Sequence, residues 1–274
     1  DCLAPDYNRC LISLSRGGAD AKVTREFDIA KRAFISDGFN LPEAKSQLDW
    51  VDIDTLYVGT DFGPGSMTKS GYPRVIKQWK RGTPLAQAVV VYEGQESDVA
   101  AFASVDKTPG YERTVFGRSI DFYNTEMSLW VKGQLIKINK PSDASLSWQR
   151  EWAFLLLKRD MTVDSRTYKN GSLLAIKFDD LMNGLYGYHV LFEPTATRSL
   201  ARSGPAFTRD HVLLNILDNV AGRIEELQYV GGQWQRRELA GAVQTIGMQT
   251  EPVLRQAEAA MNLVDLWLLN DRTG

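Results

Sequence analysis

Residues 48–58, with the sequence LDWVDIDTLYV, decide the fold class. The segment alternates apolar and polar residues and then ends in the apolar run 55–58. Alternation with a period of two is typical of a half-buried β-strand, and a short apolar run is consistent with a buried one. The segment therefore predicts β-structure. Long stretches with the 3.6-residue apolar period of a helix are scarce elsewhere in the chain.

The arrangement of this segment recurs: a polar strand, a loop with Pro or Gly, and an apolar run introduced by an acidic or aromatic residue. Successive copies lie roughly 40 to 65 residues apart, which is the spacing of four-stranded blades rather than of helical repeats. The pattern therefore predicts a β-propeller. The clear copies have the apolar runs 55–58, 152–156, 211–214 and 266–269, and 118–123 is a further candidate.

The expected fold class is all-β, a partial β-propeller of about four to five four-stranded blades. Residues 1–239 are expected to form the blades. Residues 240–274 continue the propeller either as a last blade or as a short helix plus a strand, because 251–263 has helical spacing and Pro252 suits a first helical turn. Further strands are predicted at 9–14, 23–29, 33–35, 74–79, 88–92, 127–131, 134–138, 173–178, 188–192, 223–230 and 233–239.

The composition excludes several classes of protein. The chain has 274 residues, 43% of them hydrophobic and 24% charged, with a formal net charge of −2, so nothing indicates a nucleic-acid partner. No apolar run approaches the roughly 18 residues of a membrane span. Cys2 and Cys10 could pair, but a free buried thiol is the favoured interpretation. Any targeting segment would lie upstream, which leaves the localisation open between cytoplasm and periplasm.

No catalytic, cofactor-binding or metal-binding residues are predicted in this chain. The nucleophile elbow G-x-S-x-G is absent, and Ser66 and Ser203 do not lie at a strand-to-helix junction. His189 and His211 lie inside apolar β runs, where a packed or hydrogen-bonded role is favoured over a catalytic base. Without a partnered Ser or Cys no triad is assembled, and two histidines alone fall short of a zinc site.

Other patterns have both a functional and a structural interpretation. Asp52 and Asp54 would share a face of a strand, as calcium ligands or an acid/base pair would, but a solvated turn before a core strand is favoured. Asp49 belongs to the same cluster of carboxylates, and Asp179 and Asp180 form a second cluster. The glycine-rich stretch 59–66 lacks the end of a phosphate-binding loop, so a long hairpin loop with a surface function is expected. The seven tryptophans fit packing between blades better than a sugar platform.

Several stretches resemble the N-terminal propeller of the prolyl oligopeptidase family. They are residues 6–20 (DYNRCLISLSRGGAD), 54–66 (DTLYVGTDFGPGS) and 79–85 (WKRGTPL). The last is similar to the family's recurrent turn, in which Gly-Thr-Pro precedes a strand that ends in an aromatic residue and Glu, here Tyr92 and Glu93. The resemblance extends to about Leu239.

The resemblance implies a non-catalytic role within a serine peptidase. In that family a seven-bladed propeller caps an α/β-hydrolase domain that holds Ser, Asp and His, and restricts access to short peptides. The implied partners are therefore a hydrolase domain of the same parent protein and the peptide substrates of that protein. A stand-alone propeller that binds a protein or a glycan is the alternative, and a glycoside-cleaving propeller that uses Asp52 and Asp54 is a third hypothesis.

Overall fold

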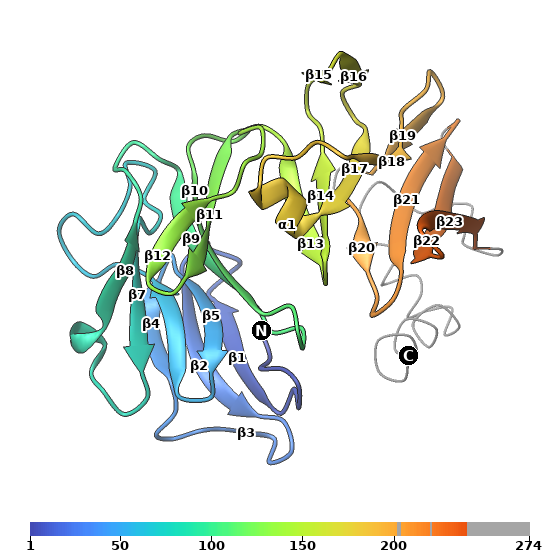
Figure 1. The fold of residues 1–274 in the computed structure, drawn as a ribbon. Helices are drawn as coiled ribbons and strands as arrows, with labels where there is room; N and C mark the ends of the chain where they lie inside the picture. Colours follow the sequence, from blue (N-terminus) through green and yellow to red (C-terminus); the bar gives the residue numbers. More distant parts are fainter. Residues whose placement is uncertain (202–203, 220, 240–274) are drawn as a thin grey trace. The chain divides into compact units, whose positions relative to one another are not determined.

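The computed structural model describes residues 1–201, 204–219 and 221–239, and these form two compact units, each described here by itself (Figure 1). The first unit is Asp1–Ser142, and the second begins at Asp143. The described part is mainly β and is built from antiparallel sheets, most of them with four strands. The all-β prediction is confirmed.

The first unit contains three sheets. The first has the order β1 (Arg9–Ser15), β2 (Lys22–Asp28) and β3 (Ala33–Phe34), with β4 (Asn40–Ala44) also paired to β2. The second comprises β5 (Gln47–Asp52), β6 (Thr55–Gly59), β7 (Val75–Lys80) and β8 (Val89–Glu93), with a 3-10 turn η1 (Leu85–Gln87) before β8. The third comprises β9 (Ala100–Asp106), β10 (Arg113–Ser119), β11 (Thr125–Val131) and β12 (Gln134–Lys137).

The described part of the second unit contains two larger sheets and a hairpin. The first sheet comprises β13 (Ser145–Gln149), β14 (Trp152–Leu156), β17 (Leu173–Lys177) and β18 (His189–Phe192), and the hairpin β15 (Met161–Val163) and β16 (Arg166–Tyr168) lies between β14 and β17 in sequence. The second comprises β19 (Arg198–Leu200), β21 (Val212–Asp218), β22 (Ala221–Val230) and β23 (Gln233–Glu238), with β20 (Ala206–Phe207) paired to β21. The short helix α1 (Phe178–Met182) follows β17.

The strand order within the sheets is that of propeller blades. In the sheets β5 to β8 and β9 to β12, strands that follow one another in the chain are neighbours in the sheet, as in the antiparallel blade of a propeller. Three of the repeated apolar runs, 55–58, 152–156 and 211–214, fall on β6, β14 and β21, each flanked by strands on both sides. A strand flanked on both sides and covered on both faces is the most buried of its sheet, which explains why these runs are continuously apolar.

The prediction that residues 118–123 form a further apolar strand is wrong. Only the first two of these residues belong to β10, and residues 120–124 form the turn between β10 and β11. Asp121 holds this turn, because its carboxylate accepts the backbone N–H groups of Tyr123 and Asn124 at 2.7 and 2.8 Å. A side chain that bonds its own backbone two or three residues on stabilises a turn rather than a ladder.

The core of the first unit contains aromatic side chains from neighbouring sheets. Trp50, Trp79 and Phe39 are buried together, with ring centroids 5.8 and 5.0 Å from Phe39. In the second unit Trp152 packs against Trp234, with ring centroids 5.0 Å apart. For these tryptophans the packing interpretation is confirmed.

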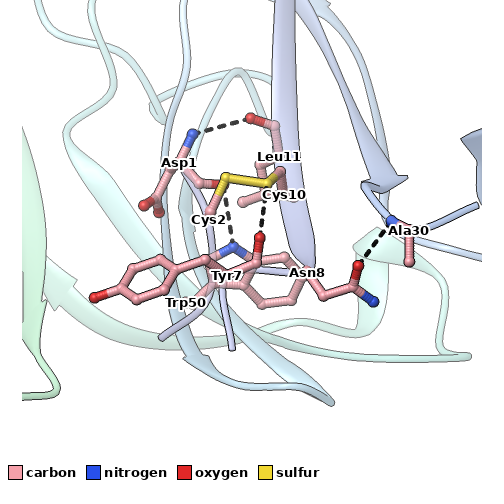
Figure 2. Close-up of a disulfide and its surroundings, with 8 residues drawn as sticks. All are labelled: Asp1, Cys2, Tyr7, Asn8, Cys10, Leu11, Ala30 and Trp50. Atoms are coloured by element: carbon pink, nitrogen blue, oxygen red, sulfur yellow. Dashed lines mark hydrogen bonds between the residues drawn. A yellow bond between two sulfur atoms is a disulfide. The ribbon is translucent and has the colours of Figure 1, made fainter. Parts of the chain in front are cut away.

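The prediction of a free thiol is wrong: Cys2 and Cys10 form a disulfide (Figure 2). The segment before β1 runs antiparallel to it, because the amide of Leu11 donates to the carbonyl of Asp1 at 2.7 Å and the amide of Leu3 donates to that of Arg9 at 2.8 Å. This pairing brings the two cysteines opposite each other. The disulfide therefore closes the N-terminal segment onto the first sheet.

Three predictions lie outside the described residues. They are the apolar run 266–269, the helical pattern at 251–263 and the fold of 240–274. Within the described residues, no helix has the length and apolar character needed to cross a membrane.

Candidate functional site

The glycine-rich stretch lies in the connection between β6 and β7, residues 60–74, which we call the β6–β7 loop. The strand β7 follows it, so the stretch is a hairpin loop as predicted and does not lead into a helix. Long loops held by a rigid sheet are common places for binding and gating functions. The β6–β7 loop is therefore the first candidate for a functional element.

The first half of the loop is organised around Ser66. This side chain is buried, and its Oγ lies 2.7 Å from the carbonyl oxygen of Gly63 and 3.3 Å from Oδ1 of Asp61. The same Oγ accepts the backbone N–H of Phe62 at 2.9 Å. All of these bonds are local, so Ser66 shapes the loop. A hydroxyl committed in this way is not arranged as a nucleophile, which needs a neighbouring base.

The second half of the loop is fixed to the connection between β8 and β9, residues 94–99. Thr68 donates from Oγ1 to the carbonyl of Val99 at 2.9 Å. Arg74 donates from Nε to the carbonyl of Gly65 at 2.6 Å and from a terminal nitrogen to the carbonyl of Gly94 at 3.0 Å. Its guanidinium therefore joins the loop to the segment that leads from β8 to β9.

A cavity of about 300 Å³ lies beside this loop. Apolar side chains and three charged residues line it. The lining residues are Leu41, Pro42, Glu43, Ala44, Lys45, Thr60, Asp61, Met67 and Leu85.

One of the charged residues at this cavity is already engaged. Nζ of Lys45 lies 3.3 Å from Asp20 and 4.2 Å from the ring centre of Tyr72, and the hydroxyl of Tyr72 donates to Asp20 at 3.0 Å. The hydrogen bond from Tyr72, followed by the contact with Lys45, lowers the pKa of Asp20. The three residues form a local network at the surface of the first unit.

The two histidines have separate surroundings in the second unit. The ring of His189 packs against Trp152 and Tyr229, with centroid distances of 5.4 and 5.9 Å. His211 donates its backbone N–H to Thr208, and its Nε2 lies 4.0 Å from Oε1 of Glu226. Within the described residues, neither imidazole is hydrogen-bonded to a serine or a cysteine. Both are packed or paired residues, as expected.

The aspartates 49, 52 and 54 do not form one site. Asp52 ends β5 and accepts the backbone N–H of Asp54 at 2.8 Å, and Asp54 lies in the turn, where it contacts Arg81 at 3.1 Å. The idea that Asp52 and Asp54 share a strand face is therefore wrong, and the solvated turn is confirmed. Asp49 accepts the backbone N–H of Val105 at 2.9 Å, and burial raises its pKa.

The remaining candidates provide no ligand set. Asp179 and Asp180 occupy the first turn of α1, where acidic residues are favourable beside the helix N-terminus. Ser203 lies outside the described residues. Within the part of the chain that the structure describes, no group of three or more His, Cys, Asp and Glu residues could hold a metal ion.

The comparison with protein families decides the identity of this fold. The model of the prolyl oligopeptidase N-terminal β-propeller domain matches residues 2–180. The chain belongs to this family. The three sheets of the first unit and the β6–β7 loop lie within the matched part of this prolyl oligopeptidase propeller, and the sheet that begins with β13 overlaps it.

The relatives of this propeller are peptidases. It is 38% identical over 250 residues to the uncharacterized peptidase y4nA of Sinorhizobium fredii, covering 88% of this chain and 34% of the relative. It is 30% identical over 247 residues to the uncharacterized peptidase RP174 of Rickettsia prowazekii, covering 84% and 34%. The structure of a post-proline cleaving enzyme from Rickettsia typhi matches with a TM-score of 0.79 at 30% identity, covering 87% and 37%.

The propeller therefore spans about a third of the length of the relatives that it matches. In the homologues the propeller is paired with a catalytic peptidase domain, and that domain is not part of this chain. The residues that sequence reasoning missed, such as Thr68 and Arg74, carry no recognisable motif. The role of each depends on the backbone carbonyl groups that the folded loop brings within hydrogen-bonding distance. The identity of the residue alone does not specify these partners.

Proposed function

We propose that this chain is the non-catalytic propeller of a prolyl oligopeptidase-like serine peptidase, where it gates substrate access and scaffolds a hydrolase domain outside the chain. The observation that carries the proposal is the family match together with the coverage of about a third of the relatives. The residues described above hold no arrangement of nucleophile and base, which is consistent with chemistry performed elsewhere.

The first test separates scaffold from catalyst. The purified chain is assayed with a chromogenic prolyl peptide, alongside the full-length protein that contains it. We expect turnover by the full-length protein and none by the chain. Turnover by the chain that persists through further purification would contradict the proposal, and so would a full-length protein that lacks a hydrolase domain.

The second test addresses gating. The full-length protein and its isolated hydrolase domain are compared on a short prolyl peptide and on an unfolded protein that contains proline. A gate that excludes large substrates predicts that the ratio of long to short substrate cleavage is higher for the isolated domain. Equal ratios for the two proteins would contradict the gating role of the propeller and would be compatible with its scaffolding role.

The β6–β7 loop is the element in which we expect this gating to be sensitive to mutation. Arg74→Ala removes the bonds to the carbonyls of Gly65 and Gly94 and loosens the loop. The full-length Arg74→Ala variant should then cleave long substrates relatively faster. Lys80→Ala, at the exposed end of β7, is the matched control with a lost positive charge. An unchanged ratio of long to short substrate cleavage in Arg74→Ala would contradict a role of the β6–β7 loop in gating.

A further inference from the structure

Two aromatic side chains stand out on the surface of the first unit. Phe122 exposes 89% and Tyr123 71% of their surface, the two largest fractions among the exposed large hydrophobic residues that the structure describes. They are adjacent in the turn between β10 and β11, and we call the pair the aromatic tip. An exposed aromatic pair in a defined conformation has the composition of a binding anchor.

The turn that carries the aromatic tip is firmly held. Oδ1 of Asp121 accepts the amides of Tyr123 and Asn124, and both carboxylate oxygens accept the side-chain amide of Asn124, at 3.0 and 2.8 Å. Asn124 in turn accepts the hydroxyl of Ser142 at 2.8 Å. These bonds use no side-chain atom of Phe122 or Tyr123, so the backbone that carries the two aromatic rings is held before any partner binds. A preformed anchor loses little conformational entropy on binding.

The aromatic tip lies at the same end of its sheet as the β6–β7 loop does of the neighbouring sheet. The carbonyl of Ser119, at the end of β10, accepts the amide of Val99 at 2.8 Å. The carbonyl of Val99 accepts the hydroxyl of Thr68 in the β6–β7 loop at 2.9 Å. Both elements connect the second and third strands of their sheets. The proposed gate and the aromatic tip therefore belong to one face of the first unit.

We infer that the aromatic tip docks into the catalytic peptidase domain of the full-length protein. The inference rests on the proposed function, because the partner is the domain with which the homologues pair their propeller. About two thirds of the length of the relatives lies outside the matched region, which leaves room for a surface that covers Phe122 and Tyr123. That surface should offer an apolar pocket, with a polar group at its rim for the hydroxyl of Tyr123.

The test uses the full-length protein with the photoreactive amino acid p-benzoylphenylalanine in place of Phe122. After irradiation, digestion and mass spectrometry locate the cross-link. We expect a cross-link within the same molecule, to the peptidase domain. The control carries the same photoreactive residue in place of Val89, which is 66% exposed but lies on β8, the outer strand of the neighbouring sheet. It should give no such product.

The other occupants of the aromatic tip give different products. A cross-link only to an added prolyl peptide would overturn the inference in favour of a substrate contact. A covalent dimer would overturn it in favour of a second copy, and no cross-link at all would leave the tip unoccupied and the inference wrong. Any of these three results, obtained with normal turnover of the prolyl reporter by the full-length protein, refutes the docking and leaves the proposed function intact. Absence of turnover by the full-length protein would instead refute the proposed function.

A second variant removes the anchor and keeps the turn. Phe122→Ser/Tyr123→Ser leaves Asp121 and Asn124 in place, so the loop should fold. In the full-length protein we expect this variant to lose hydrogen-exchange protection in the part of the peptidase domain that the cross-link identifies. Unchanged protection there would contradict the inference.

Discussion

Cys2 and Cys10 form a disulfide between the N-terminal segment and β1, and Cys10 is fully buried (Figure 2). The backbone bonds between Asp1 and Leu11 and between Leu3 and Arg9 hold the same segment. This short segment pairs with a single strand, and a segment held by so few backbone bonds opens more easily than the sheet itself. The disulfide is therefore expected to determine whether this segment stays bound.

Reduction of the disulfide should loosen the N-terminal segment. Closing a loop of this length is worth about 2–3 kcal/mol in the chain-entropy model. The Cys2→Ser/Cys10→Ser variant should therefore show faster hydrogen exchange at the amides of Leu3 and Leu11, and so should the reduced wild type. Reductant should not affect the variant further. Two free thiols in the non-reduced protein would contradict the assignment.

A buried ion pair joins the first and second sheets. The side chain of Glu26 is fully buried, and its carboxylate accepts two bonds from Arg81, at 2.8 and 3.0 Å, and the amide of Phe39 at 2.9 Å. Arg9 lies 3.4 Å away. Without Arg81 this buried carboxylate loses two short bonds from a cation and keeps Arg9 and the amide of Phe39 as partners.

Arg81→Met should accordingly lower the free energy of unfolding of the first unit by about 1–3 kcal/mol, because a buried carboxylate loses two bonds from a cation. Urea denaturation followed by circular dichroism measures this effect. Lys137→Met is the control, because Lys137 is largely exposed in its pair with Glu126 and such pairs are worth about 0–1 kcal/mol. Equal losses in the two variants would show that Glu26 does not depend on Arg81.

Gly117 on β10 has no room for a side chain. A Cβ atom there would lie 2.4 Å from Cζ of Phe102 and 2.9 Å from the carbonyl oxygen of Glu126. Gly117→Ala should therefore destabilise the first unit by about 1–3 kcal/mol, as overpacking does. Gly187→Ala is the control, because nothing lies within 4 Å of its Cβ position. A thermal midpoint for Gly117→Ala that equals that of the control would contradict the packing of Phe102.

The blade pattern could be predicted because the second strands are continuously apolar. The runs at β6, β14 and β21 lie between two other strands, and their burial requires this composition. The strand β10 was missed for a physical reason. Gly117 interrupts it, and Arg118 near its end is paired with Asp98 at 3.0 Å, so its composition is not apolar.

The features that sequence reasoning missed depend on contacts between distant or competing groups. The cysteine pairing requires the N-terminal segment to run along β1, and no local pattern specifies this. The five residues of α1 are too few to show a helical period. At Asp52 and Asp121 a side chain bonds the backbone two residues on, so that strand-like sequence becomes a turn. The β6–β7 loop was expected, whereas the bonds that Arg74 makes from it were not.

Stability should also depend on pH through Asp49. Burial raises the pKa of this carboxyl above its ordinary value of 3.8, against the bond from Val105 and the nearby charge of Lys107. A raised pKa means that the folded state favours the protonated form. The contribution of Asp49 to stability is then fully present below pH 3.8 and is lost as the pH rises through the raised pKa.

Asp49→Asn isolates this contribution, since an amide oxygen can still accept the N–H of Val105 and does not titrate in this range. The free energy of unfolding of Asp49→Asn should therefore rise relative to that of the wild type as the pH increases from about 4 to 7. Urea denaturation at several pH values gives this difference. Asp54→Asn serves as the control, because Asp54 is largely exposed. If the difference for Asp49→Asn is constant over this range, the carboxyl is ionised in the folded state throughout and its burial has no effect on its pKa.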